Sequence, residues 1–160
     1  MREQSTTLAR PEAESPTHAA HERSFQAVVT PEAVTAASEW AKHLAEELRL
    51  RNEDAYRVDL VLTEVVQNVV DHADVGDGAA PLEVHARVDD AGLRLTVVDA
   101  GREFDPLSVE RPQRPDSIET APVGGLGIVL VREFADECRY ERQGERNLFE
   151  VYFALEPEKS

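Results

Sequence analysis

Three short polar motifs follow one another along this chain, and each carries residue types that can do chemistry. They read TEVVQNVVDHA at Thr63–Ala73, VVDAG at Val97–Gly101 and GGLGI at Gly124–Ile128. The first offers a carboxylate and a carboxamide, the second a carboxylate, and the third a run of unhindered backbone N–H groups. Together they predict a nucleotide site with a general base, a magnesium ligand, an adenine anchor and a phosphate cradle. Each motif alone is weak evidence for such a site, and the prediction depends on finding all three in this order.

In the first motif, Glu64 and Asn68 are four residues apart, so they share one side of a helix. At about 100° per residue they lie at the border of an apolar arc. That arc consists of Val58, Val61, Leu62, Val65 and Val69. A carboxylate there can accept a proton from a hydroxyl group or water, and a carboxamide oxygen suits Mg²⁺. The alternative is the polar half of an ordinary amphipathic helix. His72, on the same side, is expected to be structural.

In the second motif, Asp99 closes the apolar strand predicted over residues 93–98. A carboxylate at this place is costly to bury unless it finds hydrogen-bond donors, and the 6-amino group of adenine is such a donor. Gly101 would let a planar ring approach the backbone. The alternative is a plain turn, since Asp and Gly are common turn formers.

In the third motif, Gly124, Gly125 and Gly127, with Leu126 among them, open a predicted helix. Free N–H groups at a helix N-terminus bind phosphate readily when no side chains obstruct them. The alternative is a flexible hinge. The segment lacks the Lys-Ser/Thr of a Walker P-loop, and no parallel strand leads directly into it as in a dinucleotide fingerprint. Phosphate would therefore be held without a P-loop lysine.

The motifs need helices and strands to position them, and the hydrophobic spacing predicts both. We expect helices starting at Thr30-Pro31-Glu32, spanning 52–73 and spanning 125–137, and strands at 25–29, 82–88, 93–98, 138–142 and 148–155. This order predicts an α+β fold, a two-layer α/β sandwich. Its sheet would be mixed but mostly antiparallel, with the helices on one face.

The rest of the chain divides by composition. Residues 1–24 are polar and aperiodic, so a disordered N-terminal tail is expected, followed by one domain over 25–156. Residues 102–123 are rich in proline, which predicts a mobile loop. One cysteine, Cys138, excludes an internal disulfide framework. No apolar run approaches the ~18–20 residues that span a bilayer, and no secretory signal is present, so a cytoplasmic protein is expected.

The formal charge is −15, from 32 acidic and 17 basic side chains. Such a surface repels phosphate backbones, so direct nucleic-acid binding is not expected. Two interpretations of the acidity stay open. One is a solvated surface that aids solubility, and the other is an acidic face complementary to a basic protein partner.

The ordered motifs resemble the histidine-kinase/gyrase/Hsp90-type (GHKL, Bergerat-fold) ATPases. The compact form, with GGLGI running into VLVREFADECRY and a final strand pair near NLFEVYF, is similar to the anti-sigma-factor serine/threonine protein kinases over residues 24–155. That family often carries Thr or Ser near the adenine in the last strand pair, where this chain reads Asn147–Glu150. Glu150 there would either weaken nucleotide binding or point to solvent.

The resemblance implies a role for each site residue. Glu64 would be the catalytic base, Asn68 would hold Mg²⁺ bridging the phosphates, and Asp99 would bind the adenine amino group. Gly101 would shape the adenine pocket. The ATP-lid hinge and cradle would be formed by Gly124, Gly125, Leu126 and Gly127. Candidates for a γ-phosphate contact are Arg102, Arg111 and Arg114.

The resemblance also implies partners. Such kinases use ATP and Mg²⁺, sequester a sigma factor, phosphorylate a serine on a STAS-domain antagonist and often form homodimers. Two rival functions stay open. One is a non-catalytic nucleotide-binding module that docks onto a phosphatase, kinase or sigma regulator. The other is a histidine-kinase catalytic fragment, which the lack of a helical hairpin with an exposed phosphoacceptor histidine disfavours.

Overall fold

The computed structural model describes residues 21–76, 78, 80–108 and 126–156, which form five strands, three α-helices and one short 3₁₀ helix. In chain order these are β1 His21–Val28, α1 Pro31–Glu47, α2 Asn52–His72, β2 Pro81–Asp89, β3 Gly92–Asp99, η1 Pro106–Ser108, α3 Leu126–Phe134, β4 Glu137–Gln143 and β5 Arg146–Ala154. The strands make one sheet in the order β1-β2-β3-β5-β4. Every pairing among the described strands is antiparallel, where a mixed but mostly antiparallel sheet was expected.

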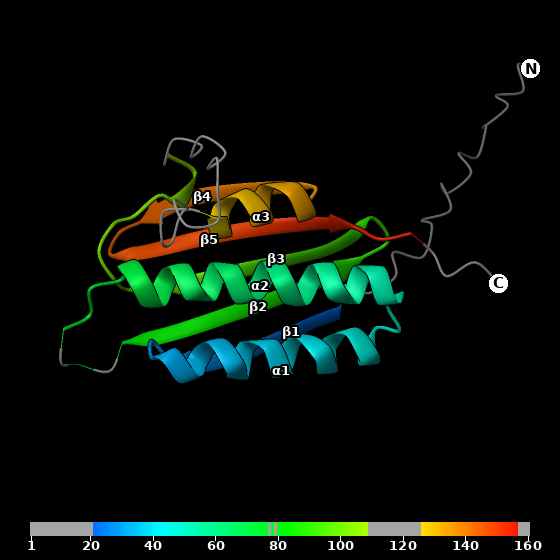
Figure 1. Ribbon diagram of the computed structural model, residues 1–160, viewed down its shortest axis with the longest axis horizontal. Helices are drawn as coiled ribbons and strands as arrows, with labels where there is room; N and C mark the ends of the chain where they lie inside the picture. The colour runs from blue at the N-terminus through cyan, green and yellow to red at the C-terminus, as the bar shows by residue number, and fades with distance from the viewer. Residues whose placement is uncertain (1–20, 77, 79, 109–125, 157–160) are drawn as a thin grey trace, which may run out of the picture.

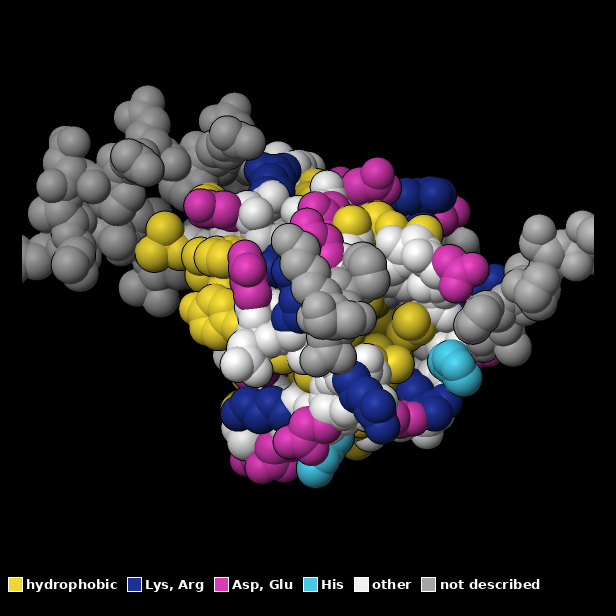
Figure 2. All heavy atoms as spheres, turned by 90° about the vertical axis from the view of Figure 1, so that its right-hand side faces the viewer, with side chains coloured by type: hydrophobic (Ala, Val, Ile, Leu, Met, Phe, Trp, Pro, Cys, Tyr) yellow, Lys and Arg dark blue, Asp and Glu magenta, His cyan; other side chains and the backbone are white. Residues whose placement is uncertain are grey.

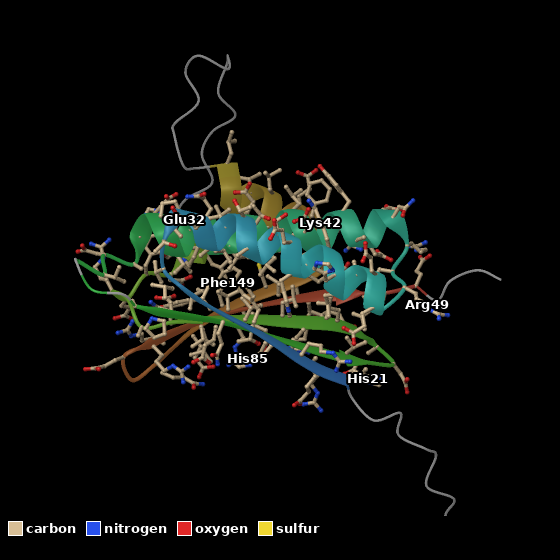
Figure 3. All side chains as sticks on the ribbon, turned by 90° about the horizontal axis from the view of Figure 1, so that it is seen from below. His21, Glu32, Lys42, Arg49, His85 and Phe149 are labelled. Carbon is tan, nitrogen blue, oxygen red and sulfur yellow. The ribbon has the colours of Figure 1, made fainter. Side chains whose placement is uncertain are left out.

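The molecule has two layers, with all three α-helices on one face of the sheet (Figure 1). The expected α+β sandwich with helices on one face is thereby confirmed. Viewed from below, the helices lie on one side, while His85 projects on the side that no described helix covers (Figure 3). Phe149 is buried on the helix side. The largest fully buried side chains of this core include Leu62, Val66, Leu82, Leu93, Leu95 and Phe153.

The start of α1 follows the predicted pattern with one difference. Pro31 occupies the first helical position and Thr30 is the extended residue before it. The Thr30 hydroxyl does not cap the helix, and lies instead 3.4 Å from the backbone oxygen of Val28. The fixed φ of proline therefore starts the helix without a side-chain cap.

The strand boundaries differ from the predictions by a few residues. The first strand begins at His21, so residues 21–24, expected in the tail, belong to β1, while residues 1–20 lie outside the described part of the chain. The third helix ends at Phe134, and β4 begins at Glu137, where the helix was expected to end. Most of the expected loop, residues 109–125, also lies outside the described residues.

Arg57 ties α2 to the end of α3. Its guanidinium donates to Asp54 at 3.0 Å, to the backbone oxygen of Phe134 at 2.9 Å and to Asp136 at 2.9 Å. Asp54 is only 2% exposed, and a buried carboxylate needs such pairing. Because the guanidinium binds both helices, it holds α3 at a fixed position along α2.

Charges of both signs intermix where α1 ends and α2 begins, on the face that Figure 2 shows. Ion pairs at this end join Arg23 to Glu47, and Arg51 to Asp54 and Glu156. The excess of acidic residues is therefore not gathered into a single-sign patch on this face. No helix in the described part of the chain is long and apolar enough to cross a membrane.

Candidate functional site

A cavity opens between α2 and the neighbouring ends of β3, β5 and β4, and it encloses about 390 Å³ of empty space, including the open solvent at its mouth. Its apolar wall comes from Val65 and Val69 of α2 and from Phe149 of β5. Two predicted site residues, Asn68 and Asp99, line this same cavity. A mainly apolar cleft with a few convergent polar groups is typical of a small-ligand site.

The start of α3 lies directly against the polar side of α2. A Cβ atom on Gly127 would be 2.6 Å from Oε2 of Glu64 and 3.8 Å from Oδ1 of Asn68. Only glycine fits there without displacing the Glu64 carboxylate. The structure therefore brings together Glu64, Asn68 and Gly127, and Asn68 also connects this cluster to the cavity.

Burial raises the pKa of the Glu64 carboxyl, and the negative charge of Asp71 raises it further. Desolvation and a like charge both disfavour the ionised form. A carboxylate with a raised pKa is a stronger proton acceptor, which is the property that a general base needs. No other described side chain is hydrogen-bonded to Glu64 or to Asn68.

Asp99 ends β3 with its side chain buried, 6% exposed. Its Oδ1 accepts hydrogen bonds from the Gly101 N–H at 2.9 Å and from Nδ2 of Asn147 at 3.0 Å. No donor among the described residues reaches Oδ2. The carboxylate therefore has one saturated oxygen and one oxygen available to a ligand in the cavity.

Gly101 has a structural reason for being glycine that the sequence did not indicate, beside the expected approach of a ring. A Cβ atom there would lie 2.6 Å from both Cβ and the backbone oxygen of Ala73, at the end of α2. The same oxygen accepts a hydrogen bond from the Arg102 N–H at 2.9 Å. The close approach is therefore between two backbone segments, and it fixes the loop after β3 against α2.

Several cavity residues were missed from the sequence. Asn147 pairs with Asp99 across β5 and β3, and Tyr140 donates its hydroxyl to Oδ1 of Asn147 at 2.6 Å. Phe104 stacks on His72, with ring centroids 4.2 Å apart and an interplanar angle of 17°. His72 and Phe104 both line the cavity. The resemblance places the stretch Asn147–Glu150 near the adenine, but only the register of the sheet shows that Asn147 pairs with Asp99, 48 residues earlier in the chain.

Other residues singled out in the sequence lie away from this cluster. Glu150 lies on the face without helices, where it accepts a hydrogen bond from Arg94 at 2.6 Å, so it does not enter the cavity. Leu126 begins α3 with its side chain 48% exposed. Arg102 lines the cavity. Outside the described residues lie Gly124, Gly125, Arg111 and Arg114.

The side chains present fit a magnesium ion held mainly by phosphate. In the described ranges no group of three or more His, Cys, Asp or Glu could hold a metal by itself. The carboxamide oxygen of Asn68 lines the cavity and offers one hard oxygen ligand. Mg²⁺ commonly keeps several waters and binds through one or two protein ligands plus substrate phosphates, so this donor set suits it.

Known proteins resemble this chain in sequence and in fold. Over 115 residues it is 28% identical to the serine/threonine-protein kinase BtrW of Bordetella bronchiseptica, covering 72% of this chain and 81% of that protein. A structure of the RsbU and RsbW domains of a Mycobacterium tuberculosis protein superposes with a TM-score of 0.63 at 15% identity, covering 84% of this chain. The match spans only 32% of that longer chain.

The fold is also that of a histidine kinase catalytic domain. The nucleotide-free catalytic domain of the histidine kinase ThkA matches with a TM-score of 0.51 at 16% identity, over 86% of this chain and 99% of that one. Residues 27–152 match the family model described as the histidine kinase-like ATPase domain. This stretch contains every element from α1 to β4 and most of β5. The chain therefore belongs to the histidine kinase-like ATPase domain family, whose members are nucleotide-binding domains.

Proposed function

We propose that this protein is an ATP-dependent serine/threonine kinase of the anti-sigma-factor type. The observation that carries the proposal is the position of Asn68, which lines the cavity with Asp99 and also lies beside Glu64 and Gly127. A nucleotide with its base at Asp99 would extend its phosphates past Asn68 toward the start of α3. Glu64 would then lie at the end of the nucleotide where the γ-phosphate is transferred.

Each residue has one task in the proposed reaction. Glu64 accepts the proton of a partner serine hydroxyl as the serine oxygen bonds to the γ-phosphorus and the bond to the β,γ-bridging oxygen breaks, releasing ADP. Backbone N–H groups at the start of α3 donate to the phosphates. Asn68 would hold the Mg²⁺ ion, which supplies neutralisation of phosphate charge when bound. The adenine amino group donates to Asp99.

The partners are proposed from the relatives. BtrW is named a serine/threonine-protein kinase and the superposed structure includes an RsbW domain. We therefore assign this chain a STAS-domain antagonist as its phosphorylation substrate and a sigma factor as the protein it sequesters, in the cytoplasm. A homodimer is part of the same proposal.

The test has a binding step and a transfer step. Calorimetry with Mg·ATP and Mg·ADP on the full chain should detect binding. Incubation with γ-labelled ATP and a STAS-domain protein from the same genome should then label a serine. Glu64→Gln should lose labelling by about 100-fold to 10,000-fold while still binding ATP.

Glu39→Gln is the matched control, because it makes the same change on an exposed residue of α1. It should label the serine as the wild type does. Tight ATP binding without labelling of any STAS-domain protein would contradict the kinase and favour the non-catalytic docking module. No heat with either nucleotide would contradict the nucleotide site itself.

A further inference from the structure

Asn147 is one of three buried polar side chains in the described part of the chain, together with Asp54 and Asp99. Its Nδ2 donates to Oδ1 of Asp99 at 3.0 Å and to the backbone oxygen of Arg102 at 2.9 Å. Its Oδ1 accepts from the Tyr140 hydroxyl at 2.6 Å and from Nη1 of Arg142 at 3.1 Å. A buried amide with partners on both sides is firmly held.

The hydrogen-bond partners of Asn147 determine the positions of its side-chain oxygen and nitrogen. A guanidinium can only donate, so the atom that faces Arg142 must be the oxygen of Asn147. A backbone carbonyl can only accept, so the atom that faces Arg102 must be the nitrogen. The amide group therefore cannot turn over, and it always presents a donor to Asp99.

The Tyr140 hydroxyl keeps its proton for this bond. Burial raises the pKa of Tyr140 first, and the negative charge of Glu103 raises it further. Arg142 adds a second connection, since Nη1 also donates to the backbone oxygen of Gly101 at 2.8 Å. The β4–β5 hairpin thus holds both the Asp99 side chain and the loop that follows it.

These hydrogen bonds determine which donor and acceptor atoms remain for a base in the cavity. Both the Gly101 N–H and Asn147 donate to Oδ1 of Asp99, which leaves Oδ2 as an acceptor on the cavity side. Because the nitrogen of Asn147 is taken by Asp99 and Arg102, it has no donor left to offer a ring. The polar end of the cavity therefore favours a ring substituent that donates.

We propose that Tyr140, Arg142 and Asn147 form a positioning relay that holds Asp99 for an amino-substituted purine and so sets the base selectivity of the site. The relay acts through Asp99, so its members are positioning residues. This inference rests on the proposed nucleotide site. It adds that selectivity for the base depends on the Tyr140 hydroxyl group in β4, which lies outside the three polar motifs.

The test compares two ligands that differ only in the amino group, Mg·ATP and the magnesium complex of purine riboside triphosphate. Calorimetry should show that the wild type prefers ATP. Tyr140→Phe removes only the hydroxyl, and should weaken ATP binding about threefold to tenfold while leaving affinity for purine riboside triphosphate unchanged. Asn147→Leu should reduce the preference for ATP further.

Tyr152→Phe is the matched control. It removes a hydroxyl that donates to the backbone oxygen of Ala91 at 2.6 Å, far from the cavity in the fold, and should leave both affinities unchanged. An equal loss of affinity for both ligands in Tyr140→Phe, or no loss for either, would overturn the relay alone. No binding of either ligand by the folded wild type would overturn the proposed site, and the relay with it.

Discussion

The two ends of the proposed nucleotide site are built differently. At the base end, Asp99, Asn147, Tyr140 and Arg142 bind one another and the backbone through hydrogen bonds of 2.6–3.1 Å. At the phosphate end, Glu64 and Asn68 have no hydrogen-bond partner among the described residues. The base end is preorganised by a hydrogen-bond network, whereas the described residues form no such network around the polar groups of the phosphate end.

The two ends therefore contribute differently to the stability of the folded protein. The buried side chains of Asp99 and Asn147 at the base end each have hydrogen-bond partners, which offset the cost of burying them. Glu64, in contrast, is partly desolvated beside the like charge of Asp71, which disfavours its ionised form. The phosphate end therefore costs stability before the nucleotide arrives, which is common for groups that must react.

Gly127→Ala is expected to have the largest effect, and it separates activity from stability. The new Cβ would lie 2.6 Å from Oε2 of Glu64, so the flexible carboxylate must move. A misplacement of about 1 Å can cost roughly 100-fold in rate. Replacing glycine by alanine inside a helix stabilises the helix by roughly 1 kcal/mol, and a smaller gain in the same direction is expected at Gly127, in the first turn of α3. Phosphotransfer assays and urea denaturation should therefore move in opposite directions, and a parallel loss of both would contradict the assignment.

Asp99→Asn comes next and acts at the base end. The amide oxygen can still accept from the Gly101 N–H and from Asn147, so the fold should persist. The amide nitrogen would then face the cavity and oppose the amino group of adenine. Calorimetry should show ATP affinity reduced about 10-fold to 100-fold. Unchanged ATP affinity would remove Asp99 from base recognition.

Gly101→Ala tests the contact that holds the base end against α2. Its Cβ would lie 2.6 Å from the Ala73 backbone, which cannot rotate away as a side chain can. We expect the free energy of unfolding to fall by about 1–3 kcal/mol, as in other overpacked sites. Gly78→Ala is the control, because its Cβ would be 3.8 Å from the nearest atom and should change little. Equal effects of the two substitutions in urea titrations would contradict this reading.

The smallest expected effect is a pH-dependent change in stability caused by Glu64, at the phosphate end. The folded state raises the pKa of Glu64 above its ordinary value of 4.5, so the folded state holds the proton more tightly than the unfolded state. This group's contribution favours folding below 4.5 and is lost as the pH rises through the raised pKa. Glu64→Gln should therefore be more stable than the wild type near neutrality, with a difference that disappears at low pH. A difference that grows as the pH falls would reverse the assigned sign.

The two ends also differ in how far the sequence could predict them. Glu64 and Asn68 are related by helical spacing, which is local, so their shared face was predictable. Asp99 was predictable from its place at the end of an apolar strand. The resemblance points to the stretch Asn147–Glu150 near the adenine. The contacts that join Asn147, Tyr140 and Arg142 depend on how β5 pairs with β3 and β4, and a single sequence does not specify that register.

For the fold too, local features could be predicted from the sequence and long-range features could not. Alternation, helical spacing and the proline at the first position of α1 placed the helices and strands within a few residues, because those signals lie within each element. The antiparallel order, with β5 between β3 and β4, depends on long-range pairing. The contact of Gly101 was likewise not local, since its neighbour Ala73, the residue that follows α2, lies 28 positions earlier in the chain.

The strand order also separates the molecule into two parts with different uses. The cavity is lined from α2, β3, β4, β5 and the loop after β3, while α1 and β1 lie at the opposite edge of the sheet (Figure 1). A protein bound at α1 and β1 would therefore contact elements that contribute no residue to the lining of the cavity. A protein partner and a small ligand can therefore bind at opposite edges of the sheet. Binding of the partner and exchange of the ligand then need not use the same surface.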